Sequence, residues 1–240
     1  MQPQSAREYL QKNRETIRYI VFVALFSALA YAVTFLFHIK VSFLTFDAKD
    51  SVITVAAFLL GPLGGTIISL LVAFIEMISI GGTGFWGFLM DFVSTAGFAV
   101  TASLIYSRFR SARGALLSVG GASIVSVLTM LLFNLFITPI YMGVDMKTVA
   151  AMIPTLLLPF NVAKALLNTS ITMLLYKPIS VTLRQMQLLP ESRSKGEKQV
   201  NASAPTAAGF SSVTLWIVLI ALAAAAISIL IFVKLHAKIQ

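Results

Sequence analysis

Apolar runs separated by turn-forming and charged segments recur along most of this chain. Most of them are near or above the ~18 residues that indicate a membrane-spanning helix. The runs predict six helices near residues 17–37, 51–61, 63–80, 86–106, 115–137 and 150–177, and a detached seventh near 213–233. We therefore expect an all-α membrane protein, a bundle of six transmembrane helices with an extra C-terminal transmembrane helix.

The breaks between the runs divide the chain into four parts. We expect a cytoplasmic tail at residues 1–16, a six-helix membrane domain at 17–178, a cytoplasmic linker at 179–212 and the extra helix at 213–234. The first apolar run is longer than the about 7–15 residues of a secretory signal and lacks a cleavage-like ending, so it predicts a retained helix. The linker assignment rests on a stretch rich in Ser, Gln, Lys and Ala.

The segment GPLGG at residues 61–65 separates the second and third runs. Pro62 cannot continue the preceding helical ladder, and the glycines permit a tight reversal. An unbroken helix over residues 51–80 would be about 45 Å long, which exceeds a ~30 Å membrane core. We therefore predict a helical hairpin whose short first arm is covered by protein or by a water-filled cavity.

Composition supports the membrane assignment, because 58% of the residues are hydrophobic, 11% are charged and the mean hydropathy is +0.90. The net charge of +9 is chiefly a topology signal, since most basic residues fall on the side of the N-terminus, which the positive-inside rule assigns to the cytoplasm. That side carries Arg7, Lys12, Arg14, Arg18, Arg108, Arg110, Arg113, Lys177, Arg184, Arg193, Lys195 and Lys198, whereas Lys40, Lys49 and Lys147 fall opposite. The chain has no Cys and two His, which excludes disulfides and thiolate metal sites and disfavours a histidine metal site.

Small residues repeat every four positions in the first predicted helix, at Ala24, Ala28 and Ala32, with Ser27 beside them. Such a stripe of small side chains lets another helix approach closely. Its partner is either another helix of this chain or a separate membrane protein.

The segment between the first two runs, HIKVSFLTFDAKDSVITV, is expected on the outer face. Alternation of apolar and polar residues over 41–45 predicts a short extended strand. Asp47, Lys49 and Asp50 follow this strand, and two interpretations of them remain open. Either Asp50 or Ser51 caps the start of the next helix, or an ordered outer loop closes over a cavity.

Glu76 and Asp91 are acidic residues in the outer half of the predicted bundle. An intramembrane acid usually faces the bundle interior or a cavity, which makes both residues candidates for ligand contact. Alternatively, Asp91 belongs to an internal hydrogen-bond network with Ser94 and Thr95, and Glu76 lies at the level of the lipid headgroups.

The sixth predicted helix contains LLLPFNVAKALLN, in which Asn161, Lys164 and Asn168 fall on one helical face. A lysine at the bilayer centre costs about 2.5–3.5 kcal/mol on insertion scales, so a compensating partner is required. That partner is either an internal carboxylate, Glu76 or Asp91, or a polar ligand that enters a cavity from the outer side.

The side chains available near this face suit a planar heterocycle. Asn134, at the end of the fifth predicted helix, and Asn161 each offer a carbonyl and an amide group, which match the edge of an imide or pteridine-like ring. Aromatic residues that could cover a flat ring are expected near the outer surface, namely Phe43, Phe46, Phe85, Trp86 and Tyr141.

Three motifs in this order, FDAKDSVITVAAFLLGPLGG, NLFITPIYMGV and LPFNVAKALLN followed by LLYKP, give the chain a family resemblance over roughly residues 17–185. It resembles the substrate-binding S components of energy-coupling factor (ECF) vitamin transporters, and within them the riboflavin-specific members. The resemblance implies a six-helix bundle in a prokaryotic cell membrane that binds riboflavin, or its phosphate FMN, at the outer side. It also implies delivery through a transmembrane coupling (T) component and two cytoplasmic ATPases, without a tightly bound cofactor or nucleic acid.

The same resemblance implies roles for individual residues. By analogy, Asn134, Asn161 and Lys164 contact the vitamin, Leu44, Phe46 and Asp47 belong to a loop that covers it, Glu76 and Asp91 are further candidates, and Ala24, Ala28 and Ala32 meet the coupling protein. The chain contains no GxxxxGK[ST] motif, so ATP hydrolysis is expected from the partners. The predicted seventh helix departs from the family pattern.

Three alternatives to this interpretation remain. An S component for another vitamin, such as folate or pantothenate, would share the fold. A membrane-embedded enzyme acting on a lipid through Asp91, Glu76 and Lys164 is disfavoured, because the acids are not clustered as metal-dependent prenyl chemistry requires. A solitary or ion-coupled transporter would be supported by internal repeats, and the sequence shows none.

Overall fold

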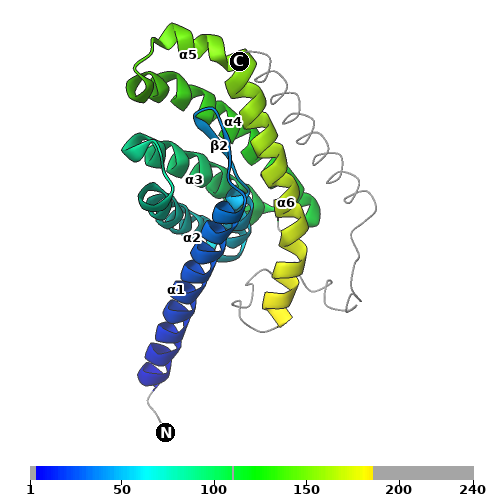
Figure 1. Cartoon of the computed structure of the whole chain (residues 1–240). Coiled ribbons are helices and arrows are strands. Elements are labelled where there is room, and N and C mark those ends of the chain that lie inside the picture. The colour runs from blue at the N-terminus through cyan, green and yellow to red at the C-terminus, as the bar shows by residue number, and fades with distance from the viewer. Residues whose placement is uncertain (1–3, 110, 186–240) are drawn as a thin grey trace.

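The computed structural model describes residues 4–109 and 111–185, so the predicted seventh helix and most of the predicted linker lie outside the described residues. The helices are α1 (Gln4–Leu36), α2 (Lys49–Ser79), α3 (Gly84–Arg108), α4 (Ala112–Met142), α5 (Met146–Met152) and α6 (Leu158–Gln185). A π-helical turn, η1 (Ile153–Leu157), joins α5 to α6, and strands β1 (Ile39–Val41) and β2 (Leu44–Phe46) lie between α1 and α2. Figure 1 shows α5 and the start of α1 at opposite ends of the described part of the molecule.

Helix α2 reverses direction at Gly61, whose φ of 84° and ψ of 174° interrupt the helical backbone. Lys49 and Glu76, near the two ends of α2, lie in direct contact, with 2.5 Å between Nζ and Oε2. In a straight helix these residues would be about 40 Å apart, so the two arms of α2 run antiparallel and the predicted helical hairpin is confirmed. The described residues contain five helices long and apolar enough to cross a membrane, and the reversal in α2 makes them six helical segments.

The arms of α2 pack closely because small residues line their contact. A Cβ atom added to Gly65 would lie 2.7 Å from the Cβ of Ala57, which is nearer than side chains normally approach. This contact belongs to the largest apolar cluster, which joins α1, both arms of α2 and α3. Its buried members are Phe22, Val23, Phe26, Ala30, Val52, Ile53, Ala56, Ala57, Ile68, Val72 and Ala99. Close packing of this kind holds a bundle together where lipid replaces water.

The connection between α1 and α2 is a small antiparallel sheet. Ile39 pairs with Phe46 and Val41 with Leu44, and the chain reverses at Ser42, which has a φ of 58°. The extended structure predicted for this outer loop is therefore confirmed, but it forms two short strands instead of one over residues 41–45, because a tight turn lies between them. The end of the bundle that carries β1 and β2 is called the strand end below, and the opposite end is called the N-terminal end.

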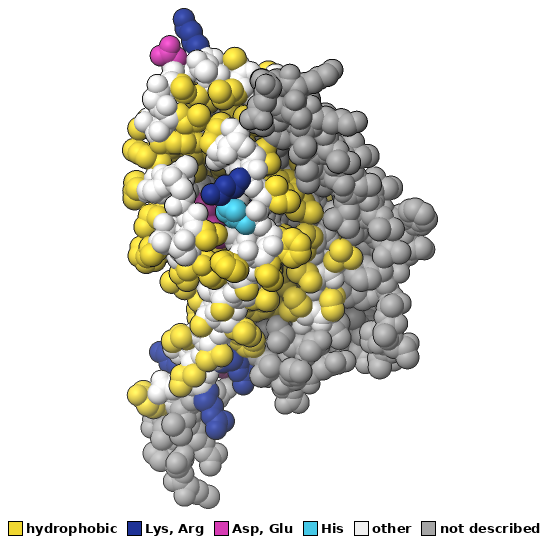
Figure 2. Space-filling view, viewed as in Figure 1, with side chains coloured by type: hydrophobic (Ala, Val, Ile, Leu, Met, Phe, Trp, Pro, Cys, Tyr) yellow, Lys and Arg dark blue, Asp and Glu magenta, His cyan; other side chains and the backbone are white. Residues whose placement is uncertain are grey.

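The stripe of Ala24, Ala28 and Ala32 is exposed along α1. On the opposite side of the same helix, Ala30 is completely buried and Ser27 donates a hydrogen bond to the carbonyl of Val23. The stripe therefore takes no part in the packing of the described helices. Figure 2 shows that apolar side chains cover most of the visible described surface, while Lys and Arg gather near the free end of α1.

We expect Gly61→Ala to destabilise the protein by about 1–3 kcal/mol, because φ near +84° with ψ near 174° is a conformation that essentially only glycine adopts. Thermal unfolding of the detergent-solubilised protein measures the change. Gly97→Ala in α3 is the matched control, since an added Cβ meets no heavy atom within 4 Å at either position. Equal stability of the two variants would contradict the role assigned to Gly61.

Candidate functional site

A cavity of about 320 Å³ opens at the strand end, within the range of about 300–1,000 Å³ typical of small-molecule sites. Its walls come from β1 and β2, both arms of α2, the start of α3, and α4 and α6. Six of the residues predicted as ligand contacts line it, namely Leu44, Asp47, Glu76, Asp91, Asn161 and Lys164. Segments distant in the sequence thus converge on one cavity.

Two predicted contacts, Asn134 and Phe46, do not line the cavity. Asn134 is completely buried in α4, where its Nδ2 donates to the carbonyl of Met130 at 2.8 Å and its Oδ1 accepts from Thr138 at 3.0 Å. Phe46 packs edge-on against Phe160, with 5.8 Å between ring centroids, and Phe160 is the residue that faces the cavity. Each residue therefore contacts a residue of the cavity wall, Asn134 the backbone of Met130 and Phe46 the ring of Phe160.

Lys164 forms its ion pairs with the segment before α2. Its Nζ lies 2.9 Å from Oδ2 of Asp47 and 3.8 Å from Oδ2 of Asp50. The alternative that Lys164 pairs with an internal carboxylate named Glu76 or Asp91 as its partner. That choice of partner is wrong, because the carboxylate is that of Asp47. Burial raises the pKa of Asp47, but the charges of Lys164 and Lys49 outweigh this effect and hold the pKa below its ordinary value. Asp47 is accordingly ionised and anchors Lys164.

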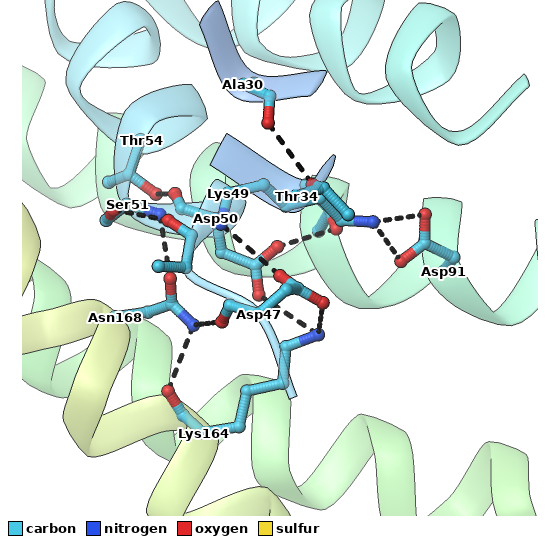
Figure 3. A network of polar contacts seen from close by, with 12 residues as sticks. Ala30, Thr34, Asp47, Lys49, Asp50, Ser51, Thr54, Asp91, Lys164 and Asn168 are labelled. Carbon is cyan, nitrogen blue, oxygen red and sulfur yellow. Dashed lines mark hydrogen bonds and ion pairs between the residues drawn. The ribbon is translucent and has the colours of Figure 1, made fainter. Parts of the chain in front are cut away.

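Lys49 also lines the cavity, although it was not among the residues predicted as ligand contacts. Its side chain is 1% exposed, and its Nζ lies 2.5 Å from Glu76 and 2.7 Å from Asp91. Figure 3 shows Lys49 extending from the start of α2 toward Asp91 on α3. In the sequence, Lys49 stands between two aspartates at the start of an apolar run. This pattern suggested a cap at the helix start or an outer loop over a cavity, and it did not suggest a buried ion pair.

Asn168 of α6 bonds to the start of α2, which lies between the ion pairs of Lys164 and those of Lys49 (Figure 3). Its Oδ1 accepts a hydrogen bond from the backbone N–H of Ser51 at 3.0 Å, and its Nδ2 donates to the carbonyl of Asp47 at 3.2 Å. The prediction that Asp50 or Ser51 caps α2 is wrong, because the Ser51 hydroxyl donates to Ala48 and Asp50 accepts from Thr95. Two side chains outside α2 accept from its first amides instead, Asn168 from Ser51 and Asp47 from Lys49, the latter at 3.3 Å.

Two buried polar atoms at the cavity have no hydrogen-bond partner among the described residues, Oε1 of Glu76 and Nδ1 of His38. Burial and the charge of Lys40 lower the pKa of His38, which favours its neutral imidazole. Buried polar atoms are normally paired, so these two atoms are available to a molecule that enters the cavity. Within residues 4–109 and 111–185, no cluster of three or more His, Asp or Glu side chains could hold a metal ion.

The match to a family model identifies the class of protein. Residues 18–176 match the model for the ECF transporter, substrate-specific component. This chain therefore belongs to the substrate-specific, or S, components of ECF transporters, which are multi-pass membrane transport proteins and not enzymes. The alternative of a lipid-modifying membrane enzyme is thereby set aside.

One similar curated protein is the riboflavin transporter RibU of Staphylococcus aureus (strain TCH60). The two are 26% identical over 183 residues, which cover 72% of this chain and 96% of that protein. The fold is also similar to that in a solved structure described as "Structure and mechanism of the S component of a bacterial ECF transporter". That match has a TM-score of 0.61 and 24% identity, and it covers 70% of this chain and 99% of the other.

We expect Lys49→Met to destabilise the protein by about 3–5 kcal/mol, because it leaves two carboxylates without their buried partner. Combining it with Glu76→Gln and Asp91→Asn should recover much of that loss, since the unpaired charges are then removed. Thermal unfolding in detergent compares these variants with Lys147→Met, which changes an exposed lysine at the same end of the bundle. A loss no larger than that of Lys147→Met would contradict the ion-pair role.

Proposed function

We propose that this chain is the riboflavin-binding S component of an ATP-driven ECF-type vitamin uptake transporter. The observation that carries the proposal is the cavity lined by Lys164, Asn161 and aromatic side chains at the strand end. Its polar groups suit a planar, hydrogen-bonding heterocycle, and the relative named above is a riboflavin transporter. Either riboflavin or FMN would be a transported ligand and not a resident cofactor.

The aromatic lining suits the flat ring of a flavin. Phe43 and Tyr141 both line the cavity and contact each other edge to face, with 6.3 Å between ring centroids. Aromatic faces and edges of this kind stack favourably against planar rings. Phe160, held by Phe46, adds a further apolar surface beside Asn161 and Lys164.

The polar edge of the ring requires donors and acceptors in one place. Lys164 has three N–H donors, and Asp47 accepts from one of them, so others remain for carbonyl oxygens of the ligand. Asn161 donates to the carbonyl of Leu157 at 2.7 Å and lines the same wall. For Asn134 to bind the vitamin directly, its amide must exchange the bonds to Met130 and Thr138 for the ligand.

We further propose that the N-terminus lies in the cytoplasm and that the strand end faces outward. The excess of Lys and Arg on the N-terminal side supports this orientation. Vitamin capture from outside then leads to release inside with a coupling T component and two ATPases. The exposed stripe of Ala24, Ala28 and Ala32 is the surface proposed for the T component.

We expect the purified chain, without partners, to quench flavin fluorescence when riboflavin is titrated at micromolar protein. Asn161→Ala and Lys164→Ala should each weaken binding roughly tenfold or more, because each removes a polar group that lines the cavity. Lys147→Ala is the matched control and should bind like the unaltered protein.

Pantothenate, folate and biotin serve as competitors in the same titration. Riboflavin that remains unquenched, or that pantothenate or folate displaces at equal concentration, would refute the vitamin assignment. Undiminished binding by a folded Asn161→Ala variant would refute the site instead. That variant matters because Lys164→Ala also leaves Asp47 without its partner.

We expect Ala28→Trp to reduce riboflavin uptake by cells that contain the complete transporter, while riboflavin binding by the purified chain stays unchanged. A bulky ring on the exposed stripe prevents close helix approach and lies away from the cavity. Leu128→Trp, also at an exposed position, is the control and should transport normally. Normal uptake by Ala28→Trp would contradict the proposed contact with the T component.

A further inference from the structure

Two groups of polar residues that line the cavity lie on different elements. One group lies near α6, where Asn161 and Lys164 accompany the aromatic side chains. The other lies where α2 meets α3. It consists of Glu76 and Asp91, which both form ion pairs with Lys49 and are called the acidic pair below. A ligand that fills the cavity would therefore meet Asn161 and Lys164 on α6, called the α6 wall below, and the acidic pair on α2 and α3, called the acidic wall below.

The acidic pair is held in place from behind. The ammonium group of Lys49 is nearly completely buried and contacts one carboxylate from each of two helical segments. The side chains of Glu76 and Asp91 are 14% and 23% exposed, and both line the cavity. Lys49 occupies Oε2 of Glu76, whereas Oε1 has no partner among the described residues.

Carboxylate oxygens accept hydrogen bonds and donate none. The free Oε1 of Glu76 is therefore satisfied by a ligand that brings an O–H or N–H group. An anionic group such as phosphate offers an acceptor instead and is repelled by both carboxylates. The acidic wall thus suits the hydroxyl-bearing chain of a flavin.

We propose that the acidic pair, positioned by Lys49, binds hydroxyl groups of the ligand's polyol chain and selects riboflavin over its phosphate FMN. This inference rests on the proposed riboflavin function and assigns opposite ends of the ligand to the two walls. Lys40 also lines the cavity, is exposed, and would attract a phosphate. Comparing the affinities for riboflavin and FMN therefore shows whether repulsion of the phosphate by the acidic pair or its attraction to Lys40 is stronger.

The test measures dissociation constants of three flavins, namely riboflavin, FMN, and lumiflavin, which has the ring without the polyol chain. We expect the unaltered protein to bind FMN at least tenfold more weakly than riboflavin. Glu76→Gln should weaken riboflavin binding roughly ten- to hundredfold, leave lumiflavin binding within about twofold, and narrow the gap between riboflavin and FMN. Asp91→Asn should shift the same ratios in the same direction.

Asp145→Asn is the matched control, because Asp145 is an exposed acid at the same end of the bundle that does not line the cavity. FMN bound as tightly as riboflavin by the unaltered protein would overturn the proposal. Equal losses for riboflavin and lumiflavin in both Glu76→Gln and Asp91→Asn would also overturn it, since the pair would then have a structural role. Failure of the unaltered protein to bind any of the three flavins would refute the riboflavin function itself.

Discussion

Two lysine side chains buried in an apolar helix bundle require carboxylates beside them, and much of the strand end is arranged to meet this requirement. Lys49 needs Glu76 and Asp91, which ties the first arm of α2 to the second arm and to α3. Lys164 needs Asp47, which ties α6 to the segment after β2. A buried charge that loses its partner costs several kcal/mol, so these pairs fix how the elements meet.

The residues of these ion pairs also line the cavity that is proposed to bind the ligand. Asp47 and Lys164 make a strong contact across the cavity wall, yet the lysine keeps N–H groups that the carboxylate does not use. Glu76 keeps an oxygen in the same way. Groups that stabilise the bundle are therefore already held in place at the cavity, which would lower the cost of ordering them when a ligand binds.

The features that the sequence predicts well are those that depend on residues close together along the chain. The reversal near Gly61 follows from backbone freedom and helix length, and the polar face of Lys164 follows from helical spacing. Ion-pair partners were predicted incorrectly because Asp47 and Lys164 lie 117 positions apart, so only the folded chain brings them together. The turn at Ser42 was missed since a positive φ at a residue other than glycine leaves little signal.

The π-helical turn η1 has a consequence for the direction of everything after it in α6. There the backbone N–H of Leu158 bonds to the carbonyl of Ile153, five positions earlier, so the turn holds one residue more than a regular α-helical turn. One residue corresponds to about 100° of rotation about the helix axis. If a regular α-helical turn replaced η1, the side chains of Asn161, Lys164 and Asn168 would be rotated by this angle about the axis of α6. They would then point away from the cavity and from Asp47. The π-helical turn η1 thus determines which face of α6 is directed toward the cavity.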